Sequence, residues 1–512
     1  MADFNLECSI EFNVPIENIL KEKFPILVAK EVNPVLFRKG VPEDKEGSRI
    51  VDWSIVSNKL NLLIEGSSYL RPHDALLRLR NYFIEKLGKE RIGVRGIFGK
   101  KYTIFYTPTR KPLDKIEIKV PWVKNIDFDG KAFKIVLENL DAKCFEDRYV
   151  ERILKRIEEK IAKQYVHGKA GLTQEIKRSE KRIEKYVMKK DISEILEEIG
   201  WAKKFSLSGI WGFSPPIASL IRAIEALIIK KVIKPMKFEE ILLPRLIPFD
   251  TEYKKGHLAI PNEIFWVCPP FSRESEYFDD FIDYVEITQE IPTEILKNKL
   301  DKPIAGLAYA QCEGFYQLFE KKVVDIDKPL RFFDRFGPTW RAEFGGVRGL
   351  ERLDEFYRME LMYLGSPEFV KDTRDEILNR TVEIVDKIFD LEWKIEKTIP
   401  IYLEHSGKVE EEKEEFVKTY DLSILLPFET LSRKEKELEI ASFHIHKDFY
   451  AERFKYKERK NRIVWTGCTG LGITRFAYVF LIRYGFDFKE WPLEIKKIIK
   501  KMPNSLKNFI VE

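Results

Sequence analysis

The alternation of hydrophobic and polar positions divides the chain into stretches of different character. Up to about residue 165, strand-like runs such as KLNLLIEG, YTIFYTP, DKIEIKVPWV and KAFKIVLENL accompany one helical run, Ala75 to Lys86. Side chains that alternate with a period of two indicate strands, and a period near 3.6 indicates a helix. Together these runs predict an N-terminal α+β domain over residues 1–165.

The next stretch is rich in charge. It contains the run QEIKRSEKRIEKYVMKKDISEILEEIGW, in which lysine and glutamate are interspersed with a few apolar residues. Runs of this kind are typical of exposed helices and linkers. We therefore expect a charged helical linker over residues 166–207.

From residue 208 the pattern becomes more hydrophobic. The segment GIWGFSPPIASLIRAIEALIIKKVIKPMKFEEILLPRL predicts a loop, a long apolar helix and then a strand that meets Pro244. Further along, TWRAEF and DEFYRMELMYL are typical of two strands joined by a loop rich in glycine and arginine. We assign residues 208–512 to a second domain, so the fold class predicted for the whole chain is α+β.

The two strands predicted within residues 332–365 carry charged and aromatic side chains on one surface. In a strand, Arg341 and Glu343 point to one face, and Phe356, Arg358 and Glu360 also share a face. Such a surface presents cations, carboxylates and one aromatic ring, which suits a nucleotide.

Length and charge change this picture only in part. A chain of 512 residues is too long for a single core and predicts two or three domains. Its 89 Lys and Arg against 84 Asp and Glu leave a formal charge of only +5, so a nucleic-acid partner has to be met by a local basic surface. With aromatic residues interleaved, one basic set suits contact with RNA, although a solvated amphipathic helix gives the same pattern. Its members are Arg71, Arg78, Arg80, Lys86, Lys89, Arg91 and Arg95.

The cysteines indicate a compartment. Cys8, Cys144, Cys268, Cys312 and Cys468 show no short-range pairing, and no secretory signal precedes them. This pattern indicates a reducing, cytoplasmic location. No apolar run approaches the roughly 18 to 20 residues that span a bilayer, so membrane insertion is not expected.

The stretch WTGCTGLGITR, Trp465 to Arg475, places one cysteine among three glycines ahead of an apolar segment. A phosphate loop, a metal ligand and an ordinary turn all fit it. It is not a Walker loop, because GLGITR lacks the Gly-Lys-Ser/Thr ending that places an ammonium group on a nucleotide phosphate. Other motifs have to decide among these readings.

Three motifs in chain order resemble a known family. KFEEILLPRL with Pro244 is similar to motif 1 of the class II aminoacyl-tRNA synthetases, Arg341-x-Glu343 with its loop and returning DEF strand is similar to motif 2, and GLGITR resembles motif 3. More specifically, HDALLRLR, IGVRGI, FWVCPP, YAQCEGF, GLERLDEFYRME and TGCTGLG together resemble the zinc-dependent seryl-tRNA synthetases of methanogenic archaea. The resemblance implies a class II catalytic domain, with an antiparallel sheet and flanking helices, and a smaller N-terminal tRNA-binding domain.

The resemblance also implies a metal site. Cys312, Glu360 and Cys468 match the three zinc ligands of the family, with one zinc ion per subunit. Two thiolates and a carboxylate from distant segments leave a tetrahedral ion one open position, which is typical of a catalytic site. In these synthetases that position receives the amino group of the amino acid, so the ion selects and orients the substrate rather than generating hydroxide. Without the family, two buried free cysteines near a strand carboxylate would be the simpler interpretation.

The nucleotide residues follow from the same resemblance. Arg341 matches the motif 2 arginine on the α-phosphate of ATP, and Arg475 matches the motif 3 arginine that lies against ATP. Both are expected to be catalytic, because a fixed guanidinium stabilises the charge that develops as a carboxylate attacks. The other expected contacts are Phe356 on adenine, Glu343 beside it, Arg352 at a phosphate, and Glu439 at a phosphate or the Mg²⁺ ion that accompanies ATP.

The partners implied by the resemblance are tRNA, ATP and an amino acid, with no DNA and no membrane. A homodimer is expected through motif 1, where Lys237 replaces the usual glycine. The expected tRNA contacts are Arg71, Arg78, Arg80 and Arg95.

The amino acid pocket departs from the family pattern. Ile401 stands where the family has tryptophan, Ser442 and His444 stand where it has asparagine and serine, and Ser423 stands where an acidic residue is expected. A site that hydrogen-bonds a small hydroxyl group rejects other side chains, so exchanging its polar groups changes which substrate satisfies it.

Two functions fit these residues, and a third from another class does not. The leading prediction is a seryl-type synthetase. The alternative is a paralogue that charges a different amino acid or passes its adenylate to an acceptor other than tRNA. A third reading, a regulatory protein that binds ATP or RNA without turnover, conflicts with the presence of both arginines and all three metal ligands.

Overall fold

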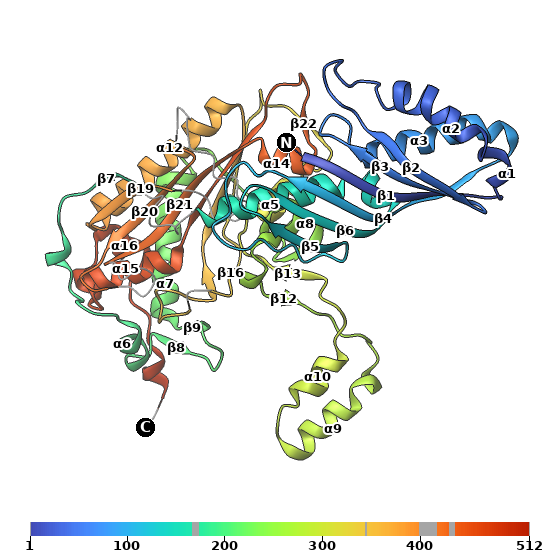
Figure 1. Ribbon diagram of the computed structural model, residues 1–512. Coiled ribbons are helices and arrows are strands. Elements are labelled where there is room, and N and C mark those ends of the chain that lie inside the picture. The colour runs from blue at the N-terminus through green and yellow to red at the C-terminus, as the bar shows by residue number, and fades with distance from the viewer. Residues whose placement is uncertain (1, 166–173, 344–345, 399–416, 430–435, 511–512) are drawn as a thin grey trace. The chain divides into compact units, whose positions relative to one another are not determined.

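The computed structural model describes residues 2–165, 174–343, 346–398, 417–429 and 436–510. These residues fall into two compact units, one made of residues 2–165 and the other of the described residues from 174 onward. The first unit has a hydrophobic core of its own, and the second has two core clusters. Figure 1 shows the helices and strands of each unit.

The first unit is built on an antiparallel sheet whose strand order is β2-β3-β1-β4-β6-β5. The strands are β1 (Ala2–Phe12), β2 (Arg49–Val56), β3 (Lys59–Gly66), β4 (Val94–Tyr106), β5 (Val123–Phe128) and β6 (Phe133–Asp141). The helices are α1 (Glu17–Leu20), α2 (Lys23–Leu27), α3 (Pro72–Leu87), α4 (Ala142–Glu146) and α5 (Tyr149–Gln164).

Helix α3 contains the predicted helical run Ala75 to Lys86 and extends it at both ends. Pro72 stands in the first helical turn, where its missing N–H is tolerated. Ala75, Leu76, Leu79 and Phe83 are buried along one stripe, and each large side chain in such a stripe stabilises the fold by about 1.5–3 kcal/mol. This stripe fixes the helix against the sheet.

One strand predicted in this unit is wrong. The run DKIEIKVPWV forms no strand among the described residues, and β5 begins only at Val123. At the start of the run, the side chain of Gln164 accepts hydrogen bonds from the N–H groups of Leu113 (2.7 Å) and Asp114 (3.1 Å). Pro112 precedes the run and Pro121 lies within it, and neither offers an N–H to a neighbouring strand.

The second unit contains an eight-stranded sheet of order β10-β15-β18-β23-β21-β20-β19-β7, antiparallel except for the β10–β15 pair. The strands are β7 (Gln174–Arg178), β10 (Glu239–Glu240), β15 (Leu330–Asp334), β18 (Met359–Gly365), β19 (Trp393–Thr398), β20 (Thr419–Leu425), β21 (Glu437–Lys447) and β23 (Trp465–Leu471). Helices α7 (Pro215–Ile228), α12 (Pro367–Glu383), α15 (Ile473–Tyr484) and α16 (Leu493–Ile499) accompany it. The predicted α+β fold, with an antiparallel sheet and flanking helices in the second unit, is confirmed.

The two faces of this sheet carry different residues because side chains alternate along each strand. Met359, Leu361 and Tyr363 of β18 pack into the large hydrophobic cluster that also holds residues of α12 and α15. Glu360 and Met362 therefore point to the opposite face. That face carries the polar groups of the site.

The charged segment after residue 173 is not a helical linker. Residues 174–178 form β7, an edge strand of the large sheet that pairs with β19. Tyr186, Ile192, Leu196 and Trp201 are buried in the core of the second unit. The prediction failed because an exposed edge strand carries lysine and glutamate as readily as an exposed helix does. The short elements that follow are α6 (Ser193–Glu198), β8 (Ala202–Lys204) and β9 (Trp211–Phe213).

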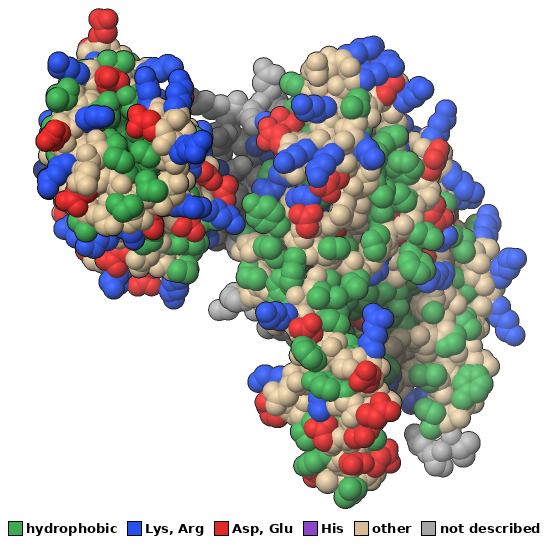
Figure 2. Space-filling view, turned by 90° about the vertical axis from the view of Figure 1, so that its right-hand side faces the viewer, with side chains coloured by type: hydrophobic (Ala, Val, Ile, Leu, Met, Phe, Trp, Pro, Cys, Tyr) green, Lys and Arg blue, Asp and Glu red, His purple; other side chains and the backbone are tan. Residues whose placement is uncertain are grey.

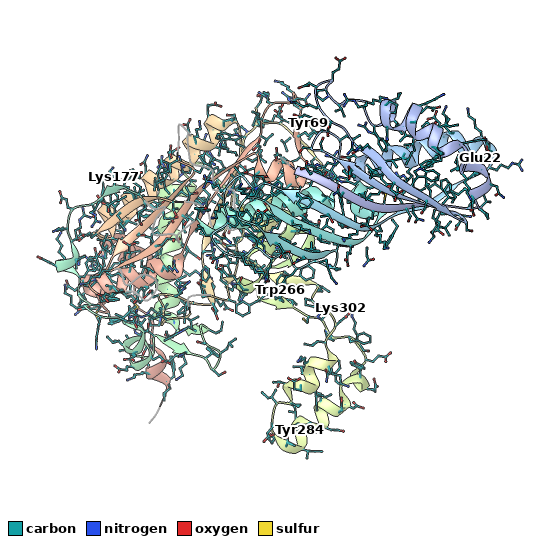
Figure 3. The ribbon with its side chains drawn as sticks, in the orientation of Figure 1. Glu22, Tyr69, Lys177, Trp266, Tyr284 and Lys302 are labelled. Atoms are coloured by element: carbon teal, nitrogen blue, oxygen red, sulfur yellow. The ribbon has the colours of Figure 1, made fainter. Side chains whose placement is uncertain are left out.

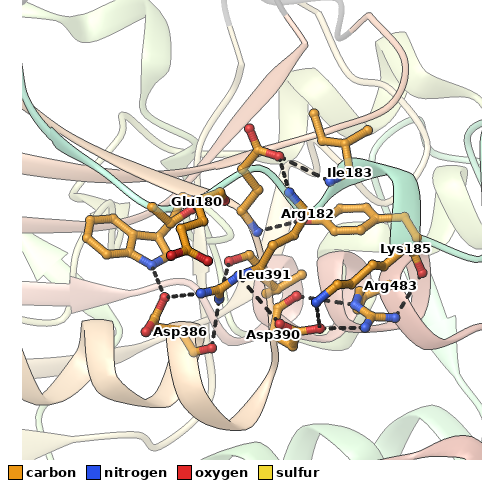
Figure 4. A network of polar contacts seen from close by, with 12 residues as sticks. Glu180, Arg182, Ile183, Lys185, Asp386, Asp390, Leu391 and Arg483 are labelled. Carbon is orange, nitrogen blue, oxygen red and sulfur yellow. Dashed lines mark hydrogen bonds and ion pairs between the residues drawn. The ribbon is translucent and has the colours of Figure 1, made fainter.

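A polar network fixes this segment to the residues that follow α12 and to α15 (Figure 4). Arg182 forms ion pairs with Asp386 (2.9 Å) and Asp390 (3.4 Å). Arg483 of α15 pairs with the same Asp390 (2.6 Å) and donates a hydrogen bond to the carbonyl of Lys185 (2.9 Å). Residues 182–185 are thus part of the second unit.

A helical hairpin is inserted between β12 (Trp266–Val267) and β13 (Ala305–Leu307). It consists of α9 (Asp279–Thr288) and α10 (Thr293–Lys299). Figure 3 labels Trp266 and Lys302 where it leaves and rejoins the unit, and Tyr284 on α9 far from both. Hydrogen bonds from Phe271 to Lys299 (2.8 Å) and from Asp301 to Pro269 (2.8 Å) join the two ends.

The surface shows no field of a single sign on the face seen in Figure 2, where cationic and anionic side chains are interspersed. This agrees with the small formal charge of +5. No helix among the described residues has the length and apolar character needed to cross a membrane.

Candidate active site

A cavity lies on the polar face of the large sheet. It is lined by side chains from β18, β20, β21 and β23, from α8 (Phe249–Lys255), and from the segments around β16 (Pro338–Trp340) and β17 (Glu355–Tyr357). The cavity collects almost all the residues that the sequence assigned to metal, nucleotide and amino acid.

The three predicted metal ligands meet at one end of the cavity. Cys312, Glu360 and Cys468 place their ligand atoms within 4.8 Å of one another, and all three side chains are buried. The register of β18 and β23 sets Glu360 opposite Gly470 and Met362 opposite Cys468, so Glu360 and Cys468 are diagonal neighbours on one face. Cys312 reaches them from the start of α11 (Glu313–Gln317).

The two thiols are electrostatically coupled. A hydrogen bond from Cys468 and the ammonium group of Lys255 lower the pKa of Cys312, against the effect of burial. The same hydrogen bond, together with burial, raises the pKa of Cys468. A cation bound between the two sulfurs would favour the thiolate form of both.

Glu360 provides a test of the metal reading. Arg358 forms an ion pair with its Oε2 atom at 2.6 Å, but neither carboxylate oxygen receives a well-aligned hydrogen bond from the described residues. A fully buried carboxylate without such bonds is costly, and a cation bound by Glu360, Cys312 and Cys468 would offset that cost. The donor set therefore fits a divalent metal ion.

Glycines of the stretch Trp465 to Arg475 make this geometry possible. A Cβ atom on Gly467 would lie 2.1 Å from the ring of Tyr363, and one on Gly470 would lie 1.8 Å from Nη2 of Arg358. The stretch is therefore neither a phosphate loop nor a simple turn. It is a β-strand that carries Cys468, followed by the helix that carries Arg475.

Two arginines border the other end of the cavity. The guanidinium of Arg341 lies 4.1 Å from the ring centre of Tyr309 and 5.6 Å from that of Phe356. Arg475 donates hydrogen bonds to the carbonyls of Glu351 (3.2 Å) and Glu439 (2.8 Å). Backbone and ring contacts hold both groups in place, which is the arrangement that binding a polyanion requires.

The remaining nucleotide residues divide into two groups. Glu343, Phe356 and Glu439 line the cavity. Arg352 is not among its lining residues and instead forms an ion pair with Glu343 (2.7 Å). Burial lowers the pKa of Arg475, although the nearby carboxylates of Glu439 and Glu343 act in the opposite direction.

Arg341 and Glu343 do not lie in a strand as predicted. Strand β16 ends at Trp340, and the N–H of Ala342 donates to the carbonyl of Glu263 (3.0 Å) rather than to a partner strand. The N–H of Arg341 itself donates to the carbonyl of Asp354 (2.9 Å), just before β17.

The predicted amino acid pocket needs one correction. Ser442 and His444 line the cavity, but Ser423 does not. The register of β20 and β21 shifts between Leu422 and Ser423, so that Ser423 lies opposite Glu439, and Asp421 is the carboxylate of β20 that lines the cavity. Ser442 donates hydrogen bonds to Asp421 (2.6 Å) and Glu439 (2.9 Å). Ile401 lies outside the described residues.

Some residues at the metal end were missed in the sequence. His446 is buried with its Nε2 atom 3.3 Å from Sγ of Cys468. Lys255 is buried with its Nζ atom 3.2 Å from Sγ of Cys312. Behind them His257 lies 2.7 Å from Glu313 and 3.3 Å from Glu252, and these carboxylates help raise the pKa of His257 to about 9 against the effect of burial. The period-two alternation through Ser442, His444 and His446 was a signal that could have placed His446 at the site.

The predicted tRNA contacts are mostly engaged within the first unit. Arg71 pairs with Glu151 (2.5 Å), Arg80 pairs with Glu146 (2.5 Å), and Arg78 donates to the carbonyl of Lys39 (2.8 Å). Arg95 of β4 is exposed. The structure thus does not bring these four arginines together as one free basic surface.

Comparisons with known proteins agree with this site. Residues 2–159 match a family described as a tRNA-binding domain, and residues 305–484 match the tRNA synthetase class II core domain (G, H, P, S and T). A type-2 serine–tRNA ligase of Methanocaldococcus jannaschii is 39% identical over 98% of this chain and 95% of its own length, and one of Methanococcoides burtonii is 33% identical over 93% and 94%.

One solved structure covers both units. It is the structure of M. kandleri SerRS in complex with A. aeolicus tRNASec, which is similar to 98% of this chain with 29% identity, covers 98% of that chain, and gives a TM-score of 0.84. The metal-ligand cluster and both arginines lie in the part that matches the class II core, and relatives align along nearly the full length. The chain therefore belongs to the type-2 serine–tRNA ligase family.

Proposed function

We propose that this chain activates serine with ATP and transfers the seryl group to tRNA. The observation that carries the proposal is the shared cavity, in which a cluster of Cys312, Glu360 and Cys468 faces two fixed arginines, Arg341 and Arg475. One end suits an amino group and the other suits a triphosphate. A substrate carboxylate held between the two ends lies next to the α-phosphate.

We propose zinc as the metal held by Cys312, Glu360 and Cys468. Thiolates favour zinc over magnesium and calcium, which prefer oxygen ligands. When bound, zinc supplies a Lewis-acidic position for the amino group of the amino acid. We propose that Glu439, which lines the cavity, meets the Mg²⁺ ion of ATP.

The protein's own groups act by positioning. Arg341 and Arg475 neutralise the phosphates, and Phe356 offers its ring to adenine. One carboxylate oxygen of the amino acid forms a bond to the α-phosphorus, the bond from that phosphorus to pyrophosphate breaks, and pyrophosphate leaves. A 3′-terminal hydroxyl of tRNA then attacks the adenylate and AMP leaves. Fixed geometry and charge accelerate both steps, and neither step needs a covalent intermediate with the enzyme.

The test is amino-acid-dependent exchange of pyrophosphate into ATP, measured on the zinc-loaded protein with each standard amino acid in turn. Exchange with serine alone supports the proposal. If none of the amino acids drives exchange in a folded protein that binds zinc and ATP, the proposal is wrong. Cys468→Ala is expected to lose zinc and exchange together while ATP still binds.

A second candidate is a paralogue that activates a different amino acid or charges an acceptor other than tRNA. It is favoured by the polar groups at the amino acid end: Ser442 is engaged by Asp421 and Glu439, and His444 faces the cavity with Nδ1 3.2 Å from the hydroxyl of Thr419. Exchange driven by an amino acid other than serine would select this candidate.

We further propose that residues 1–165 bind tRNA and that residues 208–512 catalyse together with residues 174–207, which belong to the same unit, with a homodimer as the working form. Matches to the tRNA-binding family over residues 2–159 and to the class II core over residues 305–484 support the two roles. Light scattering on the purified chain tests the dimer, and a tRNA gel shift with and without Arg95→Ala tests this arginine as a tRNA contact.

A further inference from the structure

Each of the three metal-ligand side chains lies against one nitrogen-bearing side chain. Lys255 Nζ is 3.2 Å from Sγ of Cys312, His446 Nε2 is 3.3 Å from Sγ of Cys468, and Arg358 Nη2 is 2.6 Å from Oε2 of Glu360. The three nitrogens come from α8, β21 and the residue between β17 and β18. Such one-to-one pairing is what an organised layer of donors around a metal centre requires.

Lys255 is held firmly in this position. Its side chain is buried, and its Nζ atom lies 4.9 Å from the ring centre of Tyr316 and 4.4 Å from that of Tyr450. On the same side, Glu252 of α8 and Glu313 of α11 share His257, so the helix that carries Lys255 is tied to the helix that begins next to Cys312. A buried ammonium tolerates this setting only because an anion lies next to it.

His446 is likewise enclosed. Its ring lies 4.8 Å from that of Tyr450 and 6.0 Å from that of Tyr316. A thiolate sulfur accepts hydrogen bonds and donates none. In the metal-bound protein, the thiolate of Cys468 therefore favours the tautomer of His446 that carries its proton on Nε2. The imidazole then donates directly to Cys468.

Charge explains what these donors do. Two thiolates and one carboxylate bring three negative charges to a divalent ion, and the excess would weaken the attraction of the ion for an incoming amine. An ammonium on one sulfur and an N–H on the other withdraw electron density from the ligands and maintain the Lewis acidity of the ion.

We propose that Lys255 and His446 are positioning residues of the metal centre, which hold the two thiolates and set how strongly the bound ion attracts the amino group of the amino acid. The proposal rests on the proposed function, because it takes a metal to be bound by Cys312, Glu360 and Cys468. Neither residue touches the reacting phosphate in this scheme.

Replacing the bound metal with Co²⁺ tests the proposal through an absorption band, which can be measured independently of the activity. Co²⁺ bound by thiolates gives sulfur-to-metal charge-transfer absorption, and a sulfur that loses a donor gives up its electrons more readily. In Lys255→Met, which keeps side-chain length and removes the charge, the band is expected to move to longer wavelength with one cobalt still bound. Lys254→Met removes the neighbouring ammonium, which pairs with Asp250 and Glu320 instead, and is expected to leave the band unchanged.

His446 is tested with a matched pair of variants. His446→Leu removes the donor and is expected to move the band in the same direction and to lower cobalt affinity about 10- to 100-fold. His446→Gln keeps an N–H donor of similar reach, so its band position and its cobalt affinity are expected to stay closer to those of the parent protein. In both donor-removing variants, Lys255→Met and His446→Leu, the KM for the amino acid should rise while the KM for ATP stays near the parent value.

The outcomes separate this proposal from the proposed function. If the parent protein binds no cobalt through its thiolates, the metal assignment itself fails. If the parent shows the band and the bands of Lys255→Met and His446→Leu do not move, the metal assignment stands and the donor proposal is wrong. Circular dichroism and ATP binding identify any variant that has simply failed to fold.

Discussion

Gly470 illustrates how one missing side chain shapes the site. It lies in β23 two residues after Cys468 and directly opposite Glu360, and the guanidinium of Arg358 occupies the space where a Cβ atom would stand. The atom displaced by a methyl group is the far end of a flexible side chain, so the sheet itself need not move. The consequence of a substitution should therefore be chemical rather than structural.

We expect Gly470→Ala to fold normally but to lose about 10- to 100-fold in amino acid activation, because Arg358 can no longer keep its place beside Glu360. Pyrophosphate exchange measures the loss, and thermal unfolding checks the fold. Gly96→Ala is the control, since a Cβ atom at Gly96 meets nothing within 4 Å. Full activity in Gly470→Ala would show that Arg358 has no part in the site.

Arg341 supports a second prediction at this scale. Its planar guanidinium lies over the ring of Tyr309 and donates to the carbonyl of the same residue (3.3 Å), contacts that an ammonium group cannot reproduce. Arg341→Lys should therefore reduce pyrophosphate exchange about 100- to 1,000-fold despite the conserved charge. Arg335→Lys, at the surface beside Glu240, should stay close to the parent rate. Equal rates for the two variants would place Arg341 outside the nucleotide site.

At the scale of elements, the sequence predicted best where one period dominates. The apolar stripe of α3 and the alternation along β18 were both recognisable. The meeting of Glu360 and Cys468 was implied only by the family resemblance, because the stretch that forms β23 fitted a loop or a turn equally well. Charge alone could not distinguish the edge strand β7 from a helix. His446 was not predicted as a site residue, although the alternation with Ser442 and His444 places it on the same face. Its burial against Tyr316 and Tyr450 depends on other segments of the chain, and this part could not be predicted from the local pattern.

The contact between α3 and α5 gives a pH-dependent prediction. Glu151 of α5 pairs with Arg71 (2.5 Å) and with His73 (3.1 Å), and His73 also contacts the hydroxyl of Tyr102 (2.9 Å). Burial alone would raise the pKa of Glu151, but these partners lower it from 4.5 to about 2. A carboxylate with a lowered pKa stabilises the fold above its unfolded pKa, and that stabilisation is lost as the pH falls toward the folded pKa.

Glu151→Gln should therefore destabilise the first unit at neutral pH, by up to about 3 kcal/mol. The stability difference between parent and variant should be constant above about pH 5 and should shrink as the pH falls from 4.5 toward 2. The stability difference is measured by unfolding the full chain in denaturant and monitoring hydrogen exchange in peptides from α3 and α5. A difference that does not change with pH would mean that Glu151 acts through packing and not through its charge.

At the scale of the whole molecule, the two units have separate cores, so the stability of each unit can be measured by itself. All three proposed metal ligands belong to the second unit, and one of them, Cys312, comes from outside the sheet. A metal that binds only the folded state adds stability by mass action, about 2.7 kcal/mol when its free concentration is 100 times its dissociation constant. That gain should be confined to the unit that holds the ligands.

We therefore expect a chelator to lower protection from hydrogen exchange around Cys312, β18 and β23 and to leave the sheet of residues 2–165 unchanged. Cys468→Ala should show this loss before any chelator is added and should not respond further to it. Cys268→Ala is the matched control, because Cys268 is a free, partly exposed cysteine of the same unit outside the cluster, and it should behave like the parent. If chelation instead loosened both units equally, metal binding would have to be coupled to the first unit as well. Cooperative unfolding of the two units would then replace the independent behaviour that their separate cores predict.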